Sequence, residues 1–230
     1  MPFYYLFDPT MLIVLPALIF TVWAQMNVTS TYKKYSKITV SRRMTGFDSA
    51  RRILDANGLY DVRIERVHGH LTDHYDPRAN VIRLSDSVFD STSAAAIGVA
   101  AHEAGHAVQY AKGYAPIKLR QSIIPMTRIG SSLAMPLFII GILFAMAELM
   151  YIGIAFYSLA LLFQLVTLPV EFNASSRAMA ALRESGLLSE SELQASRKVL
   201  TAAALTYVAA LASSLLSLLR LIILANNRRR

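Results

Sequence analysis

Long stretches without a charged residue constrain this chain most strongly. No Asp, Glu, Lys or Arg occurs between Asp8 and Lys33, and Met11 to Met26 within that stretch is strongly apolar. Further charge-free runs cover residues 129–147, 149–170 and 199–219. Because about 20 apolar residues cross a bilayer as a helix, each run is long enough for a transmembrane segment. The sequence therefore predicts a mainly α-helical membrane protein with three or four transmembrane helices.

The composition agrees with a membrane protein. Of the 230 residues, 54% are hydrophobic and only 17% are charged, against about 25% charged in typical soluble proteins. The net charge of +8 is concentrated beside apolar runs, in Lys33–Arg43 and Arg228–Arg230. Such flanks act as topology signals and contact anionic lipid. No nucleic-acid-binding motif accompanies the charge, so nucleic acid is not an expected partner.

The positions of these basic residues predict a topology. The cluster after the first run places the following segment in the cytoplasm and the N-terminus outside, as a retained anchor rather than a signal peptide. Runs 129–147 and 149–170 are separated only by Glu148, which predicts a helical hairpin. Arg128 before the hairpin and Arg177 after it place both hairpin ends in the cytoplasm.

The last apolar run leaves two alternatives open. It continues past Arg220 to Leu224 and could cross as a fourth span. A crossing would put Arg228–Arg230 outside, against the positive-inside tendency. A helix that packs on the others or lies at the interface is the alternative.

Residues 36–90 are typical of a soluble segment. Apolar positions at helical spacing predict a helix over Thr45–Asn57. Alternation predicts short strands over 62–65 and 80–85. The second strand, directly before the next helix, could offer its edge to an extended peptide; an edge strand without a ligand is equally compatible with the sequence.

The motif that carries chemistry is His-Glu-Ala-Gly-His at residues 102–106. On a helix, His102 and His106 project from one face, and Glu103 is close enough to hold a water beside a metal ion. This is the H-E-x-x-H pattern of two zinc ligands and a carboxylate general base. Two core histidines on an ordinary helix are the alternative. The chain has no cysteine, so a zinc ion would be held by histidine and carboxylate.

A catalytic zinc ion usually has three protein ligands. No histidine follows His106, so the third ligand is expected to be a downstream carboxylate. The candidates are Glu148, Glu171, Glu184, Glu190 and Glu192.

Topology favours Glu171 among these carboxylates. Glu148 lies at the outer end of the predicted hairpin, and the last three candidates lie in a polar stretch typical of solvated helix surface. Glu171 follows Pro169 where the second hairpin helix re-emerges, on the side from which the chain departed at Ile129. A helix-end glutamate that snorkels to the interface is the alternative.

The motif, the hairpin and Glu-Phe-Asn-Ala-Ser from Glu171 resemble membrane metallopeptidases of the HtpX and CAAX-prenyl-protease type. The chain is more similar still to the YugP-like neutral zinc metallopeptidases. The resemblance covers nearly the whole chain, including residues 71–77, 81–85, 101–109, 168–178 and 199–208. It implies a gluzincin in which His102, His106 and Glu171 bind one Zn²⁺ and Glu103 is catalytic. HtpX-type enzymes carry an aspartate where this chain has Ser175, so only a serine hydroxyl could take that place.

The predicted function is membrane-bound, zinc-dependent peptide hydrolysis, in which Glu103 activates a zinc-bound water. The expected substrates are peptides or membrane proteins at the cytoplasmic face of a bacterial cell membrane, in quality control or processing. Candidate donors to the oxyanion are Arg177, Tyr207 and His74. A site-2-type intramembrane protease is disfavoured because no aspartate follows Asp90. A non-catalytic zinc-binding scaffold or chaperone is the remaining alternative; the oligomeric state is left open.

The predicted organisation combines these segments around a small α+β zincin-like cytoplasmic domain. The segments are an anchor (1–30), the zincin-like domain (31–128), a transmembrane hairpin (129–170), a third-ligand helix with a polar segment (171–198) and a C-terminal hydrophobic helix (199–230).

Overall fold

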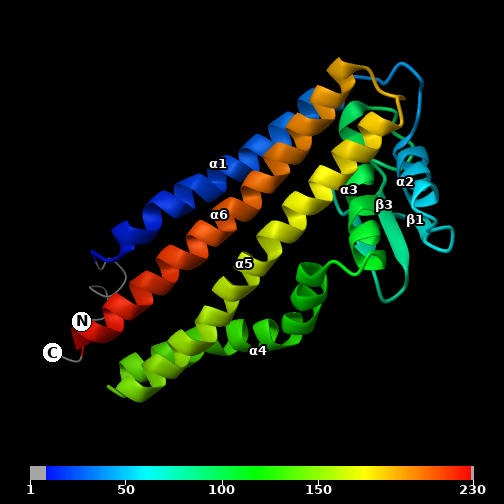
Figure 1. Ribbon diagram of the computed structural model, residues 1–230. Coiled ribbons are helices and arrows are strands. Elements are labelled where there is room, and N and C mark those ends of the chain that lie inside the picture. The colour runs from blue at the N-terminus through cyan, green and yellow to red at the C-terminus, as the bar shows by residue number, and fades with distance from the viewer. Residues whose placement is uncertain (1–8, 229–230) are drawn as a thin grey trace. The chain divides into compact units, whose positions relative to one another are not determined.

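A computed structural model describes residues 9–228 of the chain, which are mainly helical (Figure 1). The elements in chain order are α1 (Met11–Tyr35), α2 (Gly46–Ala56), β1 (Arg63–Val67), β2 (His74–Asp76), β3 (Val81–Ser85), α3 (Ala94–Ala111), α4 (Ala115–Leu143), α5 (Ala147–Glu184) and α6 (Glu190–Arg228). This confirms a mainly α-helical protein with a small α+β part.

Four helices in the described part of the chain, α1, α4, α5 and α6, are long and apolar enough to cross a membrane. The apolar run that the sequence left open therefore belongs to α6, which continues without interruption past Arg220. The hairpin turn lies between α4 and α5, where Ala145 adopts a left-handed φ of 54°. Glu148 falls in the first turn of α5 rather than in the break. Arg229 and Arg230, used in the topology argument, lie outside the described residues.

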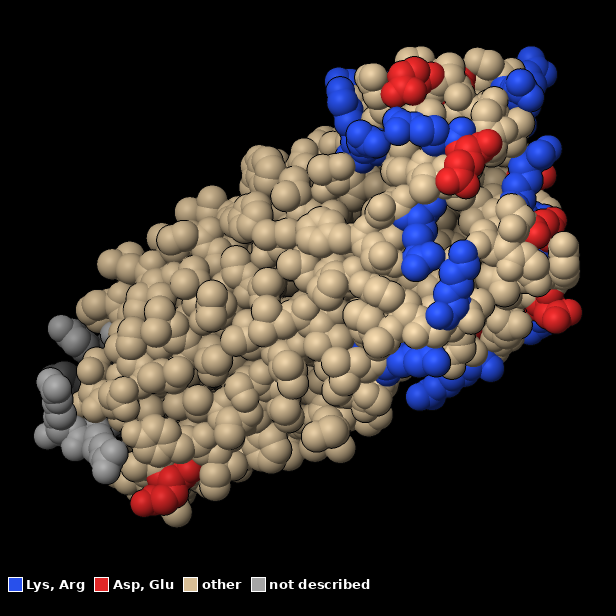
Figure 2. Space-filling model, viewed as in Figure 1, with Lys and Arg blue, Asp and Glu red and all other residues tan. Residues whose placement is uncertain are grey.

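The chain divides into two compact units, and the apolar runs form most of the first. This unit contains residues up to 25 together with 119–168 and 206 onward. Its helices pack through small residues: a Cβ on Gly153 would lie 2.8 Å from the Ala134 carbonyl oxygen. On the face shown in Figure 2, its surface carries very few charged side chains, and most charges gather over the second unit.

The second unit, residues 26–118 and 169–205, contains a three-stranded sheet in the order β1-β3-β2. β3 pairs in parallel with β1 and antiparallel with β2, so it is the middle strand. The expectation that this strand offers an edge to an extended peptide is therefore wrong. The free edges belong to β1 and β2, and the three-residue β2 was not predicted.

The core of the second unit lies between the sheet and the helix pair α2 and α3. Leu54, Ile82, Leu84 and Ile97 are fully buried there. Thr45 forms a capping box with Asp48 and so fixes the start of α2. Apolar burial and this cap stabilise the sheet and α2, and α3 packs against both.

Candidate metal centre

Helix α3 presents the two motif histidines on one face, as their spacing predicts. Ser93 caps its N-terminus by accepting a hydrogen bond from the Ala96 N–H at 3.2 Å. The Nε2 atoms of His102 and His106 lie 3.1 Å apart. The Nε2 atoms of both rings therefore converge on one point beside α3.

Helix α5 brings Glu171 to the same point. Its Oε2 lies 3.2 Å from His102 Nε2 and 3.5 Å from His106 Nε2. Among the described residues, these three side chains form a group that could hold a metal ion. The carboxylate is almost fully buried, at 3% exposure.

A glycine between the histidines allows α5 to approach this closely. A Cβ on Gly105 would lie 2.7 Å from the Ala174 carbonyl oxygen. Since real Cβ atoms essentially never come so close to backbone, Gly105 sets how near α3 and α5 can come.

The spacing of the three donor atoms fits zinc. Tetrahedral zinc with ligand bonds of about 2.0–2.1 Å places neighbouring ligand atoms about 3.3 Å apart. The three separations are 3.1, 3.2 and 3.5 Å. Two imidazole nitrogens and one carboxylate oxygen also match the donor set of catalytic zinc sites, which leave a fourth position open.

Gln109 determines which nitrogen of His106 carries the proton. The Gln109 amide donates to the Val170 carbonyl at 2.8 Å and to Asn173 Oδ1 at 3.0 Å. Its Oε1 therefore faces His106 Nδ1, 3.0 Å away, and accepts the Nδ1–H. This leaves a lone pair on His106 Nε2, aimed at the three-donor group.

Ser175 plays the corresponding part for His102. Its Oγ lies 3.1 Å from His102 Nδ1, so it can accept the Nδ1–H and leave Nε2 unprotonated. HtpX-type enzymes, which the sequence resembles, carry an aspartate at this position, where this chain has serine. A neutral hydroxyl makes this hydrogen bond weaker than a carboxylate would.

The electrostatics of the group favour a bound cation. Burial would lower the pKa of His106, but the hydrogen bond to Glu171 and the nearby negative charges of Glu103 and Glu171 raise it above its ordinary value. Three converging acceptors repel one another unless a proton or a metal ion lies among them.

Glu103 differs from the three donors in its contacts. The residue is 8% exposed, and among the described residues its carboxylate forms no hydrogen bond or ion pair. It is thus free to accept a hydrogen bond from a water. A second acid lies nearby: burial, together with the charge of Glu103, raises the pKa of Asp73, which accepts hydrogen bonds from the Ser85 N–H and hydroxyl.

The candidates for oxyanion donor are dispersed. Arg177 donates its Nε–H to Asn173 Oδ1 at 2.7 Å and so extends the Gln109 network. His74 is on β2, with Nδ1 2.9 Å from the Thr72 carbonyl and Nε2 3.4 Å from Arg83. Tyr207 is on α6, in the first unit. The oxyanion role of each stays a prediction.

Two polar residues around the group were missed from the sequence. Gln109 is fully buried and lies one turn after His106, and this spacing was the available signal. Its link to Asn173 joins residues 64 apart in the chain and has no sequence signal. None of Glu148, Glu184, Glu190 and Glu192 belongs to the metal-competent group among the described residues.

Comparisons with known proteins show which family the chain resembles. Residues 10–226 match the profile of a family described as "Putative neutral zinc metallopeptidase". The chain is 49% identical over 213 residues to the "Putative membrane protease YugP" of Bacillus subtilis (strain 168). The alignment covers 93% of this chain and 95% of that protein. No solved structure shows a significant match.

Proposed function

Since the chain belongs to the family of neutral zinc metallopeptidases, we propose that it is a membrane-bound zinc endopeptidase of the gluzincin type. His102, His106 and Glu171 are its zinc ligands, and Glu103 is its general base. The observation that carries the proposal is the meeting of three donor atoms at separations of 3.1 to 3.5 Å. When bound, zinc lowers the pKa of a coordinated water toward about 7 and polarises a carbonyl group.

The protein's own residues supply the proton transfers and the orientation. The Glu103 carboxylate, which has no protein partner in the described chain, accepts a proton from the attacking water and delivers it to the leaving amine. Gln109 and Ser175 hold the imidazoles of His106 and His102 with Nε2 toward the centre. Their hydrogen bonds fix the ligand geometry before substrate arrives.

The proposed location is the cytoplasmic face of a cell membrane. The basic residues Lys33, Lys34 and Lys37 follow the apolar part of α1, and Arg177 and Arg183 follow that of α5. Under the positive-inside tendency, these segments are cytoplasmic. Substrates are then peptides or membrane proteins within reach of that face, as in membrane-protein processing or quality control.

The test compares wild type with Glu103→Gln, purified in detergent, for zinc content and casein cleavage. The variant keeps the ligands and loses the base, so we expect one zinc per chain and a loss of at least 100-fold in cleavage. Glu171→Ala serves as the second arm and should lose zinc. Unchanged cleavage by Glu103→Gln would reject the mechanism, and full zinc in Glu171→Ala would reject the ligand.

A non-catalytic zinc-binding scaffold is the competing function. It would bind the same metal through the same three residues and would show no cleavage that depends on Glu103. The unpaired, nearly buried Glu103 carboxylate favours catalysis, because burying a carboxylate without a partner costs stability. The same pair of assays decides between the two functions.

A further inference from the structure

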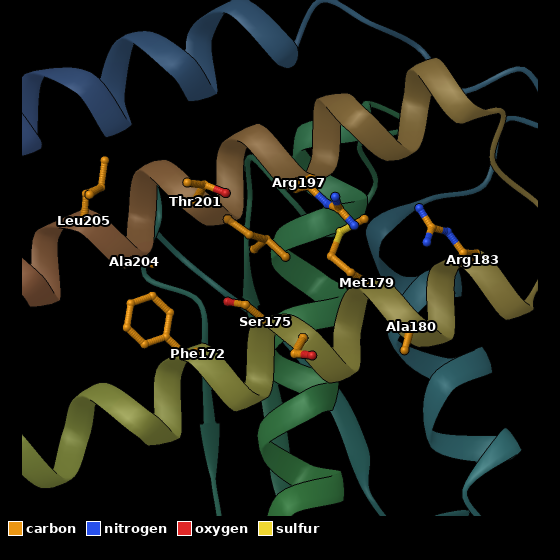
Figure 3. Close-up of a pocket in the computed structure, with 11 residues that line it drawn as sticks. Phe172, Ser175, Met179, Ala180, Arg183, Arg197, Thr201, Ala204 and Leu205 are labelled. Atoms are coloured by element: carbon orange, nitrogen blue, oxygen red, sulfur yellow. The ribbon is translucent and has the colours of Figure 1, made fainter.

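A cavity of about 480 Å³ lies in the second unit between α5 and α6. This volume is within the range of about 300–1,000 Å³ that small-molecule sites occupy. Figure 3 shows Arg183 and Arg197 at one end of the cavity and Phe172 and Leu205 at the other. The lining is therefore amphipathic along its length, with cations at one end and apolar side chains at the other.

The cavity is separate from the proposed catalytic centre. Phe172 follows Glu171 by one residue, so its side chain leaves α5 about 100° round the helix from the carboxylate. Ser175 borders the cavity and contacts Nδ1 of His102, whereas Nε2 of that ring faces the metal-competent group. An occupant would therefore lie behind His102, away from the donor atoms.

The two arginines have little to neutralise them within the protein. Among the described residues, Arg197 has no acidic partner. Arg183 lies 3.6 Å from Glu190, and both side chains are more than half exposed, at 59% and 68%. An exposed pair of this kind contributes little and exchanges readily for a better anion. Arginine side chains are well suited to a phosphate group, which they can bind through two parallel hydrogen bonds.

The two ends of the cavity differ in how close they lie, in sequence, to the candidate membrane segments. Phe172 lies two residues after the charge-free run 149–170, and Leu205 lies within the charge-free run 199–219 of α6. The apolar end therefore adjoins the candidate membrane segments in sequence, and the arginine end is the more distant one on both helices. A bilayer lipid has the same order, from acyl chain to headgroup.

We propose that this cavity binds an anionic phospholipid, with the phosphate on Arg183 and Arg197 and an acyl chain along Phe172 and Leu205. Basic pockets between membrane helices bind lipid headgroups in this way. The occupant lies one side chain, Ser175, away from His102. The proposal does not depend on peptide hydrolysis, and measurements of lipid binding alone test it.

The test measures lipid binding to the full-length protein in detergent by native mass spectrometry, with phosphatidylglycerol and phosphatidylcholine of equal chain length. We expect phosphatidylglycerol to bind at least tenfold more tightly. Arg183→Gln combined with Arg197→Gln should abolish that preference. Arg52→Gln combined with Arg78→Gln removes the same charge from exposed positions outside the cavity and should leave the preference intact.

A second variant tests the cavity without changing its charge. Thr201 lines the cavity and is itself exposed, so Thr201→Phe fills space without disturbing the core. We expect it to weaken phosphatidylglycerol binding at least tenfold while zinc content stays at the wild-type level. Zinc content also reports whether each variant is folded.

Four outcomes would overturn the proposal. The first is equal binding of the two lipids, and the second is full binding by both cavity variants. The third is displacement of the lipid by inorganic phosphate at equal concentration, which would make free phosphate the ligand. The fourth is displacement by a stoichiometric casein peptide, which would make the cavity a peptide site.

Discussion

At the scale of the residue, Gln109 is a buried amide that orients His106, one of the proposed zinc ligands. It makes three hydrogen bonds, to His106, Val170 and Asn173, and is fully buried. Replacing it with Met keeps the volume and removes all three. Because partners that orient ligating histidines are worth about 10- to 100-fold in metal affinity, we expect a loss of that size. Competition with a chromophoric chelator measures it.

The matched control for this variant is Gln194→Met. Gln194 is exposed on α6, so the same chemical change should leave zinc affinity at the wild-type value. Equal zinc affinity in Gln109→Met and wild type would contradict the role assigned to the amide.

The raised pKa of His106 predicts how zinc binding depends on pH. In the metal-free protein, Glu171 and Glu103 keep His106 protonated to a higher pH than a free imidazole. Zinc requires the neutral ring, so a proton competes with the metal below that raised pKa. Zinc affinity should therefore rise from pH 6 to pH 8, which chelator competition at fixed ionic strength measures. An affinity that is flat or falls over this range would contradict the assignment.

At the scale of the element, the approach of α3 to α5 depends on one missing side chain. Alanine is about 1 kcal/mol more favourable than glycine inside a helix, so propensity alone predicts that Gly105→Ala stabilises α3. The structure predicts the opposite, because the new Cβ would lie 2.7 Å from the Ala174 carbonyl oxygen. We expect Glu171 to be pushed away from the histidines and zinc affinity to fall at least tenfold.

Gly98→Ala is the control on the same helix. Its Cβ would contact Ser196 on α6 at 3.1 Å rather than α5. This variant should keep zinc within a few-fold of wild type, even if its melting temperature changes. Equal zinc loss in both variants would show that α3 responds to any added methyl group, and the specific role of Gly105 would be lost.

The elements that sequence predicts well are those with a local signal. Charge-free runs predicted the four long helices, and apolar spacing predicted a helix over Thr45–Asn57, where the structure has α2 at Gly46–Ala56. β2 was missed because three residues, His74–Asp76, are too short for alternation to register. The middle position of β3 was missed because strand order depends on pairing between distant segments.

The same distinction holds within the candidate centre. His102, Glu103 and His106 form a contiguous motif that a single sequence displays, and Glu171 followed from topology. The hydrogen bonds from Gln109 to Asn173 and from His102 to Ser175 join α3 to α5. Contacts between residues so far apart produce no recognisable spacing in the sequence, so only the structure shows them.

At the scale of the whole molecule, the absence of cysteine allows a clean test of topology. Basic flanks predict that Glu148 lies outside the cell and Glu184 in the cytoplasm. In intact cells, an impermeant maleimide should label Glu148→Cys and spare Glu184→Cys until the membrane is permeabilised. Labelling of Glu184→Cys from outside, with Glu148→Cys spared, would place the proposed active site on the other face.

The separation of the donors along the chain has a consequence for biosynthesis. Glu171 is made 65 residues after His106, which corresponds to about 3–13 s at common rates of translation. Throughout that interval the nascent chain carries two of its three donors. Under the proposed function, peptide cleavage therefore begins only after the hairpin that precedes Glu171 has been made.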